Sequence, residues 1–292
     1  MKNPIVSVVL GTYNRINFLK LTIDSIRQEL KDIKHEIIVV DGGSTDKTLP
    51  WLLKQKDVLT IVQHNRGEWG GKKIERRSWG YFMNLGFKSG QGKYICMISD
   101  DCLVVPNAIK NGIKLFDEKL ANGEKIGLVA FYWRNWPMHK KYFVMTTLGN
   151  TLYVNHGLFL NKALQEIGFI DEENFQFYNG DCDLGLKFAH AGYKCVASEN
   201  SYIEHYQHAN LKVRKTNESL SSVDGPAFLK KWEGIFWTDE HNLGGKIIEK
   251  EFYDKTKTAT KYKYVQFMHL DVIGFKFVQE SKKFVKHFFM RT

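Results

Sequence analysis

Short apolar runs rich in Val and Ile recur along the first hundred residues and constrain the fold more than any other feature. The runs Ile5–Leu10, Glu36–Val40 and Tyr94–Ile98 consist almost entirely of apolar side chains, which is typical of strands buried on both faces. Residues 18–26 place apolar side chains at helical spacing, and residues 48–55 predict a second helix. This alternation predicts an α/β fold with a mixed, mostly parallel sheet flanked by helices.

The second half of the 292-residue chain is less regular. We expect three strands, at residues 127–133, 151–159 and 195–203, and two helices, at residues 162–167 and 181–192. Residues 210–224 are polar and predict a mobile connection, whereas the aromatic stretch 228–237 predicts a partly helical segment. The length suits one α/β domain followed by a C-terminal extension.

Polar residues directly follow three of the predicted strands. The segments Thr12–Arg15, Asp41–Ser44 and Asp100–Asp101 each come at the end of an apolar run. In sheets of this kind, ligands bind at the carboxyl edge of the strands, where the connecting loops converge. We therefore expect these three segments to be neighbours in space.

Asp100 and Asp101 form the most informative of these segments. Adjacent carboxylates at the end of a buried strand repel each other and lose hydration, so such a pair is usually retained for a cation or for hydroxyl groups. Mg²⁺ and Mn²⁺ take oxygen ligands, commonly carboxylates together with substrate phosphates. The alternative is a solvated loop, but the apolar run Tyr94–Ile98 fixes the pair at the sheet edge. The pattern therefore favours a divalent-metal site.

Two further acidic motifs have simpler alternatives. Asp41 can accept a hydrogen bond from the imide N–H of a base, but its turn, taken alone, is better explained as a link in which Ser44 or Thr45 caps the next helix. Asp181 and Asp183 begin a predicted helix, where carboxylates are good caps. Asp183 suits the capping role, and Asp181 is the better candidate for a general base.

Four motifs, in order and at matching spacing, resemble those of the GT-A glycosyltransferases of family 2. They are Val6–Arg15; Val39–Thr48; Asn84–Gly86 with Gly92–Ile95 and Asp100–Asp101; and Gly168–Asp171 with Asp181–Leu184 and Gly192–Lys194. The resemblance spans roughly residues 5–208, so it is far more specific than any single motif. It implies a GT-A (Rossmann-like) fold with a nucleotide-sugar half at about 1–105, an acceptor half at 106–210, and a basic, aromatic-rich helical extension at 211–292.

The same resemblance implies roles for individual residues. Those implied to bind the donor are Thr12, Tyr13, Arg15, Asp41, Ser44, Asn84 and Asp100. Asp101 would hold a Mg²⁺ or Mn²⁺ ion that bridges the two phosphates, and His205 would be a further metal contact. Asp181 would take the acceptor proton in a single displacement that inverts the anomeric carbon.

Three positions depart from the family pattern. Ser99 stands where many relatives have Asp, and Gly180 replaces the Glu that usually precedes the base. Met83 replaces an Arg that is often found before the third-motif Asn. We therefore expect Arg77, or its neighbour Arg76, to supply the phosphate contact instead.

The formal net charge of +10 is concentrated near the C-terminus. Residues 255–292 contain eight lysines and one arginine against two acidic residues. Within them, residues 276–292 predict a basic amphipathic helix with its phenylalanines on one side. Such a helix either lies on an anionic membrane surface or packs its phenylalanines on the domain, and the sequence leaves both open.

The four cysteines show no CxxC or Cys/His ligand spacing, which is typical of reduced thiols in an intracellular protein. The sequence also shows no leader-like segment and no apolar stretch of membrane-spanning length. We therefore expect a cytoplasmic protein, with peripheral membrane contact through residues 276–292 as the open question.

The predicted function is metal-assisted transfer of a sugar from a nucleotide-diphosphate carrier to a hydroxyl of a glycan or lipid-linked acceptor, in polysaccharide or cell-surface glycan biosynthesis. A nucleotidyltransferase would normally show a glycine-rich basic phosphate loop after the first strand, and Gly11–Asn14 is not one. A non-catalytic binding module would have no use for Asp101 and Asp181. Nucleic-acid binding is disfavoured, because the charge is terminal and no recognition motif accompanies it.

Overall fold

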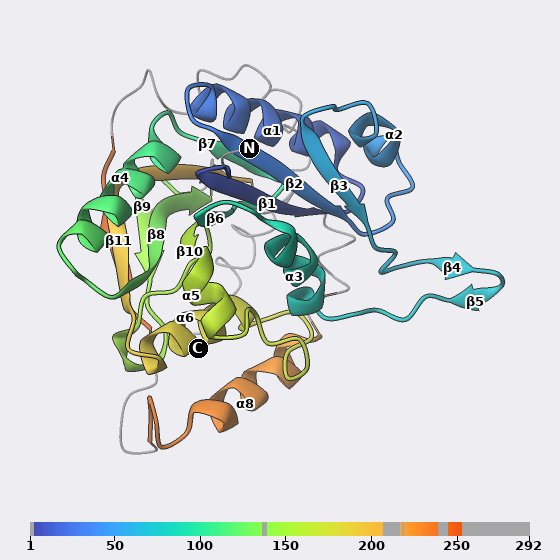
Figure 1. Ribbon diagram of the computed structural model, residues 1–292. Helices are drawn as coiled ribbons and strands as arrows, with labels where there is room; N and C mark the ends of the chain where they lie inside the picture. Colours follow the sequence, from blue (N-terminus) through green and yellow to red (C-terminus); the bar gives the residue numbers. More distant parts are fainter. Residues whose placement is uncertain (1–2, 136–138, 207–216, 218, 239–244, 253–292) are drawn as a thin grey trace, which may run out of the picture.

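In the computed structural model, which describes residues 3–135, 139–206, 217, 219–238 and 245–252, the chain folds around one large mixed sheet (Figure 1). The strands of this sheet are β1 (Val6–Thr12), β2 (His35–Asp41), β3 (Val58–Val62), β6 (Tyr94–Met97), β7 (Cys102–Val104), β8 (Ile126–Asn135), β9 (Tyr142–Met145), β10 (Gly157–Leu160), β11 (Lys194–His205) and β12 (Ile247–Lys250). Its main path has the order β12-β9-β8-β10-β6-β1-β2-β3, and β11 pairs with β8 and β7.

Helices cover both faces of this sheet (Figure 1). They are α1 (Ile16–Leu30), α2 (Thr48–Leu52), α3 (Trp79–Ser89), α4 (Ala108–Ala121), α5 (Asn161–Glu166), α6 (Gly180–His190) and α8 (Ser221–Trp232), with a 3₁₀ turn at Leu148–Asn150. A separate small hairpin, β4 (Glu68–Trp69) and β5 (Lys72–Lys73), projects from the body of the molecule. Among the described residues, no helix combines the length and the apolar character needed to cross a bilayer.

The first half of the sheet is parallel, as the apolar runs predict. β1 lies between β2 and β6, and β2 pairs with β3, all in parallel register. The register places Thr12 directly opposite Asp41, so the loops that follow β1 and β2 start side by side. The sheet turns antiparallel at β10, which pairs with both β6 and β8, and β11 then runs parallel to β8. The predicted mixed, mostly parallel sheet is confirmed.

Each face of the sheet has its own apolar core. Apolar residues of α1, α2 and α4 pack on one face, against side chains such as Val8 and Leu10 of β1. Residues of α3, α5 and α6 pack on the other face, where Val9 and Ile38 point. This alternation along β1 is the period-2 pattern of a strand buried on both sides.

Helix α3 approaches the sheet closely because it carries a glycine at the contact. A Cβ added to Gly86 would lie 2.4 Å from Cγ1 of Val9 and 3.1 Å from Cγ2 of Val40. Any larger side chain would push α3 away from β1 and β2, so Gly86 sets the distance between this helix and the sheet.

Most expected elements of the second half are present, with three differences. The expected strand at 151–159 is shortened to β10, and of the residues before it only Leu152 forms an isolated bridge. The segment expected to be mobile up to residue 224 already includes the first turn of α8. The extension is not purely helical, because β12 pairs with β9 at the edge of the sheet. The basic segment 276–292 lies outside the described residues.

Helix α8 docks through a buried charge network. Nζ of Lys231 lies 2.7 Å from a carboxylate oxygen of Asp171 and 2.7 Å from Oδ1 of Asp183. Nε1 of Trp232 donates to the same oxygen of Asp183 at 2.8 Å. The expected capping role of Asp183 is therefore wrong: its carboxylate is fully buried and turned towards α8 instead of the helix end. Burial raises the pKa of Asp183, so the carboxylate depends on Lys231 to stay charged.

Candidate active site

A pocket of about 440 Å³ opens at the carboxyl ends of β1 and β6, next to the start of α6. It gathers eight of the residues that the sequence marked for donor, metal or base: Thr12, Tyr13, Arg15, Arg77, Asp100, Asp101, Asp181 and His205. Arg76, the second candidate for the phosphate contact, lines the same pocket. Segments more than a hundred residues apart in the sequence therefore meet in one cleft, as strand-edge convergence predicts.

Arg15 holds the acidic pair together at the floor of this pocket. Its Nη1 lies 2.8 Å from Oδ1 of Asp100 and 2.8 Å from Oδ2 of Asp101, and Thr12 Oγ1 donates to Asp100 at 2.7 Å. Burial, together with repulsion from Asp101, raises the pKa of Asp100. Burial also works against ionisation of Asp101, but Arg15 and His205 outweigh it and lower that pKa. Asp101 is therefore the more readily ionised carboxylate of the pair.

Asp101 and His205 face each other at a distance that suits a shared cation. Nε2 of His205 lies 3.4 Å from Oδ1 of Asp101, a buried oxygen that accepts no hydrogen bond from the described residues. Nδ1 of His205 lies 3.0 Å from Oδ1 of Asn135, an acceptor, which assigns the ring proton to Nδ1. A proton or a metal ion between Nε2 of His205 and Oδ1 of Asp101 would satisfy both atoms.

Asp181 stands at the first turn of α6 and faces the same pocket. Its Oδ1 accepts the backbone N–H of Cys182 at 2.9 Å. Burial raises the pKa of Asp181, and the hydrogen bonds from Cys182 and from Asn155 only partly offset this. A carboxylate with a raised pKa is a stronger base than an ordinary aspartate, which suits proton abstraction from an alcohol.

Three residues marked for donor binding do not line the pocket. Asp41 is fully buried; its Oδ1 accepts from the N–H groups of Gly43 and Ser44, while its Oδ2 has no partner among the described residues. Ser44 accepts from the backbone of Asn14 and so ties the first two loops together. Asp41 and Ser44 thus shape the turn whose Gly42 forms part of the pocket wall.

Asn84 is the third, and it lies inside the molecule. Its amide nitrogen donates to the carbonyl of Ile170 at 2.9 Å and to Glu172 at 2.7 Å, and its oxygen accepts from Ile170 N–H. These bonds use both amide protons, so the structure gives Asn84 the role of joining α3 to the 170–172 loop. The motif match identified a constrained position but not the direction of its side chain.

Asp224 is a residue that the sequence reasoning missed. Its fully buried carboxylate, on the first turn of α8, accepts the backbone N–H groups of Gln176, Phe177 and Tyr178 at 2.7–2.8 Å. Phe177 and Tyr178 line the pocket just before Asp181. Asp224 is therefore a positioning residue for the loop that leads to Asp181. No local motif marks it, because its partners lie almost fifty residues away in the sequence.

Replacing Asp224 with Asn should disturb this loop without touching the donor residues. An amide offers one acceptor oxygen without charge, so at least one of the three N–H groups loses its partner and the others are held more weakly. Because a shift of about 1 Å near reacting atoms costs on the order of 100-fold in rate, we expect kcat to fall by about that factor while nucleotide affinity changes little. The exposed Glu233→Gln, at the other end of α8, is the matched control. Equal activity of the two variants would show that Asp224 does not position the loop.

Comparison with known proteins decides the family. The model of glycosyl transferase family 2 matches residues 7–190, which is more than half of the chain. This chain belongs to glycosyl transferase family 2. The predicted enzyme class, a glycosyltransferase, and the predicted family resemblance are confirmed, and the nucleotidyltransferase alternative finds no support.

The relatives of this family 2 glycosyltransferase include proteins of bacteria and archaea. An uncharacterized glycosyltransferase of Rickettsia typhi is 32% identical over 202 residues, covering 64% of this chain and 59% of the relative. The chain thus spans about three fifths of that relative's length. In Methanococcus voltae, a dolichyl N-acetyl-alpha-D-glucosaminyl phosphate 3-beta-D-2,3-diacetamido-2,3-dideoxy-beta-D-glucuronosyltransferase is 22% identical over 253 residues, covering 80% of this chain and 76% of that one.

Solved structures show the same fold. The mannosyltransferase PcManGT of Pyrobaculum calidifontis, in complex with GDP-Man and Mn²⁺, superposes with a TM-score of 0.55 at 16% identity, covering 79% of this chain and 65% of that one. Residues 1–349 of TarS from S. aureus, in complex with UDP-GlcNAc, superpose with a TM-score of 0.51 at 17% identity, covering 77% and 66%. The expected GT-A fold is thereby confirmed.

Proposed function

We propose that this family 2 glycosyltransferase moves a sugar from a nucleotide-diphosphate carrier to an acceptor hydroxyl, with inversion at the anomeric carbon and with help from a divalent metal ion. The observation that carries the proposal is the shared pocket: the Asp101–His205 pair and the Asp181 carboxylate open into the same cleft. A metal-binding pair and a base in one cleft are the two parts that a single displacement on a sugar diphosphate requires.

Asp101 and His205 fit a divalent ion. The orphaned Oδ1 of Asp101 and the Nε2 lone pair of His205 supply one oxygen and one nitrogen donor 3.4 Å apart. A mixed oxygen and nitrogen set suits Mn²⁺ better than Mg²⁺, which prefers oxygen alone. When bound there, the ion would stabilise the negative charge that develops on the departing diphosphate.

The other pocket residues are placed for binding and proton transfer. Arg66, Arg76 and Arg77 bring positive charge to the pocket wall, which suits a diphosphate. The guanidinium carbon of Arg66 lies 5.3 Å from the ring centroid of Tyr13, so an aromatic and a cationic surface meet where a base would stack. Asp41, which is fully buried outside the pocket, supports the turn that carries Gly42 into the pocket wall. Asp181 takes the proton of the acceptor hydroxyl as the new bond to the sugar forms.

A panel of UDP-, GDP- and dTDP-sugars, each with and without Mn²⁺, tests this proposal. At about 100 times its Kd, the correct donor should raise the Tm by about 5 °C, and only in the presence of metal. The same donor should be hydrolysed slowly without an acceptor. Stabilisation by no nucleotide sugar, or equal stabilisation with a chelator present, would refute the metal-assisted transfer.

In this proposal the acceptor is a glycan or a lipid-linked sugar at the membrane. The reaction is then a step of polysaccharide or cell-surface glycan biosynthesis. The support is the basic amphipathic pattern of residues 276–292, which suits an anionic lipid surface. Flotation with anionic liposomes should recover the full chain but not a chain ending at residue 275. Equal recovery of both would remove the membrane contact from the proposal.

A further inference from the structure

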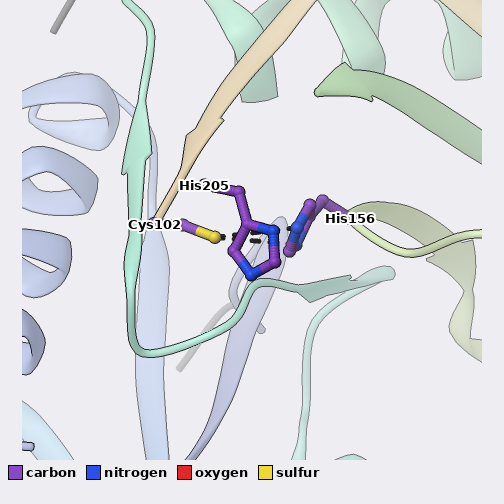
Figure 2. A group of neighbouring side chains, drawn as sticks. All are labelled: Cys102, His156 and His205. Carbon is purple, nitrogen blue, oxygen red and sulfur yellow. Dashed lines mark hydrogen bonds between the residues drawn. The ribbon is translucent and has the colours of Figure 1, made fainter. Parts of the chain in front are cut away.

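A second group of metal-ligand side chains lies against the proposed catalytic pair. Figure 2 shows that three side chains converge: Cys102 at the start of β7, His156 in the loop just before β10, and His205 at the end of β11. One ligand atom from each of the three lies within 4.8 Å of the other two. The proposed transfer uses only His205, so Cys102 and His156 have no task in it.

The spacing in this Cys102–His156–His205 cluster is close to that of a coordinated metal. Sγ of Cys102 lies 3.6 Å from Nε2 of His156. In a tetrahedral zinc site, bonds of about 2.3 Å to sulfur and about 2.0 Å to nitrogen place these two atoms about 3.5 Å apart. All three ligand atoms lie within 4.8 Å of one another, so coordination of one ion requires them to move closer by at most about 1.5 Å.

The surroundings of the cluster favour a soft ion over Mg²⁺. Cys102 and His156 are almost fully buried, and the ring of His156 packs edge-on against Trp133. Sulfur and imidazole ligands in a site with little water select Zn²⁺-class ions rather than oxygen-seeking ones.

We propose that Cys102, His156 and His205 form a binding site for a thiophilic divalent ion such as Zn²⁺, distinct from the Asp101–His205 site. On binding, the Cys102 thiol releases its proton to solvent, a sulfur–metal bond forms, and each imidazole donates one nitrogen lone pair. A neutral imidazole has a single free lone pair, so His205 serves one metal at a time. Zn²⁺ in the cluster therefore excludes Mn²⁺ from Asp101 and inhibits the enzyme, a consequence that rests on the proposed function.

Cobalt absorption of the full chain, without any donor, tests the site itself. One equivalent of Co²⁺ should give the near-ultraviolet band of a cobalt–thiolate bond and the visible bands of tetrahedral coordination. Cys102→Ser should lose the thiolate band, whereas Cys195→Ser, a matched change at a half-buried cysteine of β11, should keep it. A wild-type spectrum without a thiolate band, or a band that survives in Cys102→Ser, would overturn the proposal.

X-ray absorption of the zinc-loaded wild-type chain covers the outcome in which Cys102→Ser does not fold. We expect one sulfur at about 2.3 Å and nitrogen ligands at about 2.0 Å, and a shell without sulfur would overturn the site.

Displacement of bound Mn²⁺ by Zn²⁺ tests the exclusion, and the electron paramagnetic resonance signal of the released Mn²⁺ measures it. If the enzyme never binds Mn²⁺, the proposed function fails while the cobalt result still decides the cluster; Mn²⁺ that stays bound beside Zn²⁺ overturns the exclusion.

Discussion

Asp181→Asn is expected to lower kcat by about 1000-fold, because general-base catalysis by a positioned side chain contributes on the order of 10² to 10⁴ in rate. The amide keeps the size of the carboxylate and can still accept the N–H of Cys182, so the pocket and the affinity for the donor should stay close to those of the wild type. Initial rates of transfer and calorimetric titration with the donor measure the two quantities separately.

The pH dependence gives a second, independent readout of the same residue. The base works only when deprotonated, so the activity of the wild type should fall as the pH drops through the pKa of Asp181, which burial places above the ordinary aspartate value. Asp181→Asn should lack this acidic limb. Asp24→Asn, an exposed change on α1, is the control and should leave rate and profile unchanged. An acidic limb that persists in Asp181→Asn would assign the base to another group.

Asp101→Asn is expected to remove the metal requirement together with most of the activity. Charge stabilisation by a bound ion is worth several kcal/mol, so we expect kcat/KM to fall by about 100- to 1000-fold. The metal-dependent rise in Tm with nucleotide should disappear as well. The remaining Arg15–Asp100 ion pair keeps the floor of the pocket in place, so the fold itself should survive the substitution.

Asp117→Asn is the matched control for this change, because Asp117 pairs with Lys93 at the surface, away from the pocket. It should retain full activity and full metal-dependent stabilisation. If Asp101→Asn still bound Mn²⁺ as tightly as the wild type, other residues would have to be the metal ligands.

The strand-end residues could be predicted because their positions follow from local sequence. A buried run fixes where a strand ends, and parallel pairing then brings Thr12, Arg15 and Asp100 to one edge whatever the rest of the chain does. Their contacts with one another are therefore already implicit in the pattern of apolar runs. The strand-end rule alone does not place Asp181 and His205, because their segments reach the pocket through the antiparallel half of the sheet.

Other features depend on packing that no local pattern records. Asn84 sits in a matching motif, yet its side chain points away from the pocket because α3 presses its glycine face onto β1. Asp183 was expected at a helix cap and instead meets Lys231 of α8. Cys102 and His156 are far apart in sequence and show no ligand spacing, so only the folded sheet brings them together. The helices and strands could be predicted from the sequence, but the directions of these side chains could not.

The hydrogen bonds between Asp224 of α8 and the loop before Asp181 let one wall of the pocket change independently of the rest. Asp224 lies beyond residues 7–190, the part that matches the family model, yet it holds the wall of the pocket next to the base. Substitutions in α8 therefore reach the wall next to Asp181 without changing the residues proposed to bind the nucleotide and the metal. The proposed function then allows acceptor preference to change through this helix while the residues proposed to act on the donor stay the same.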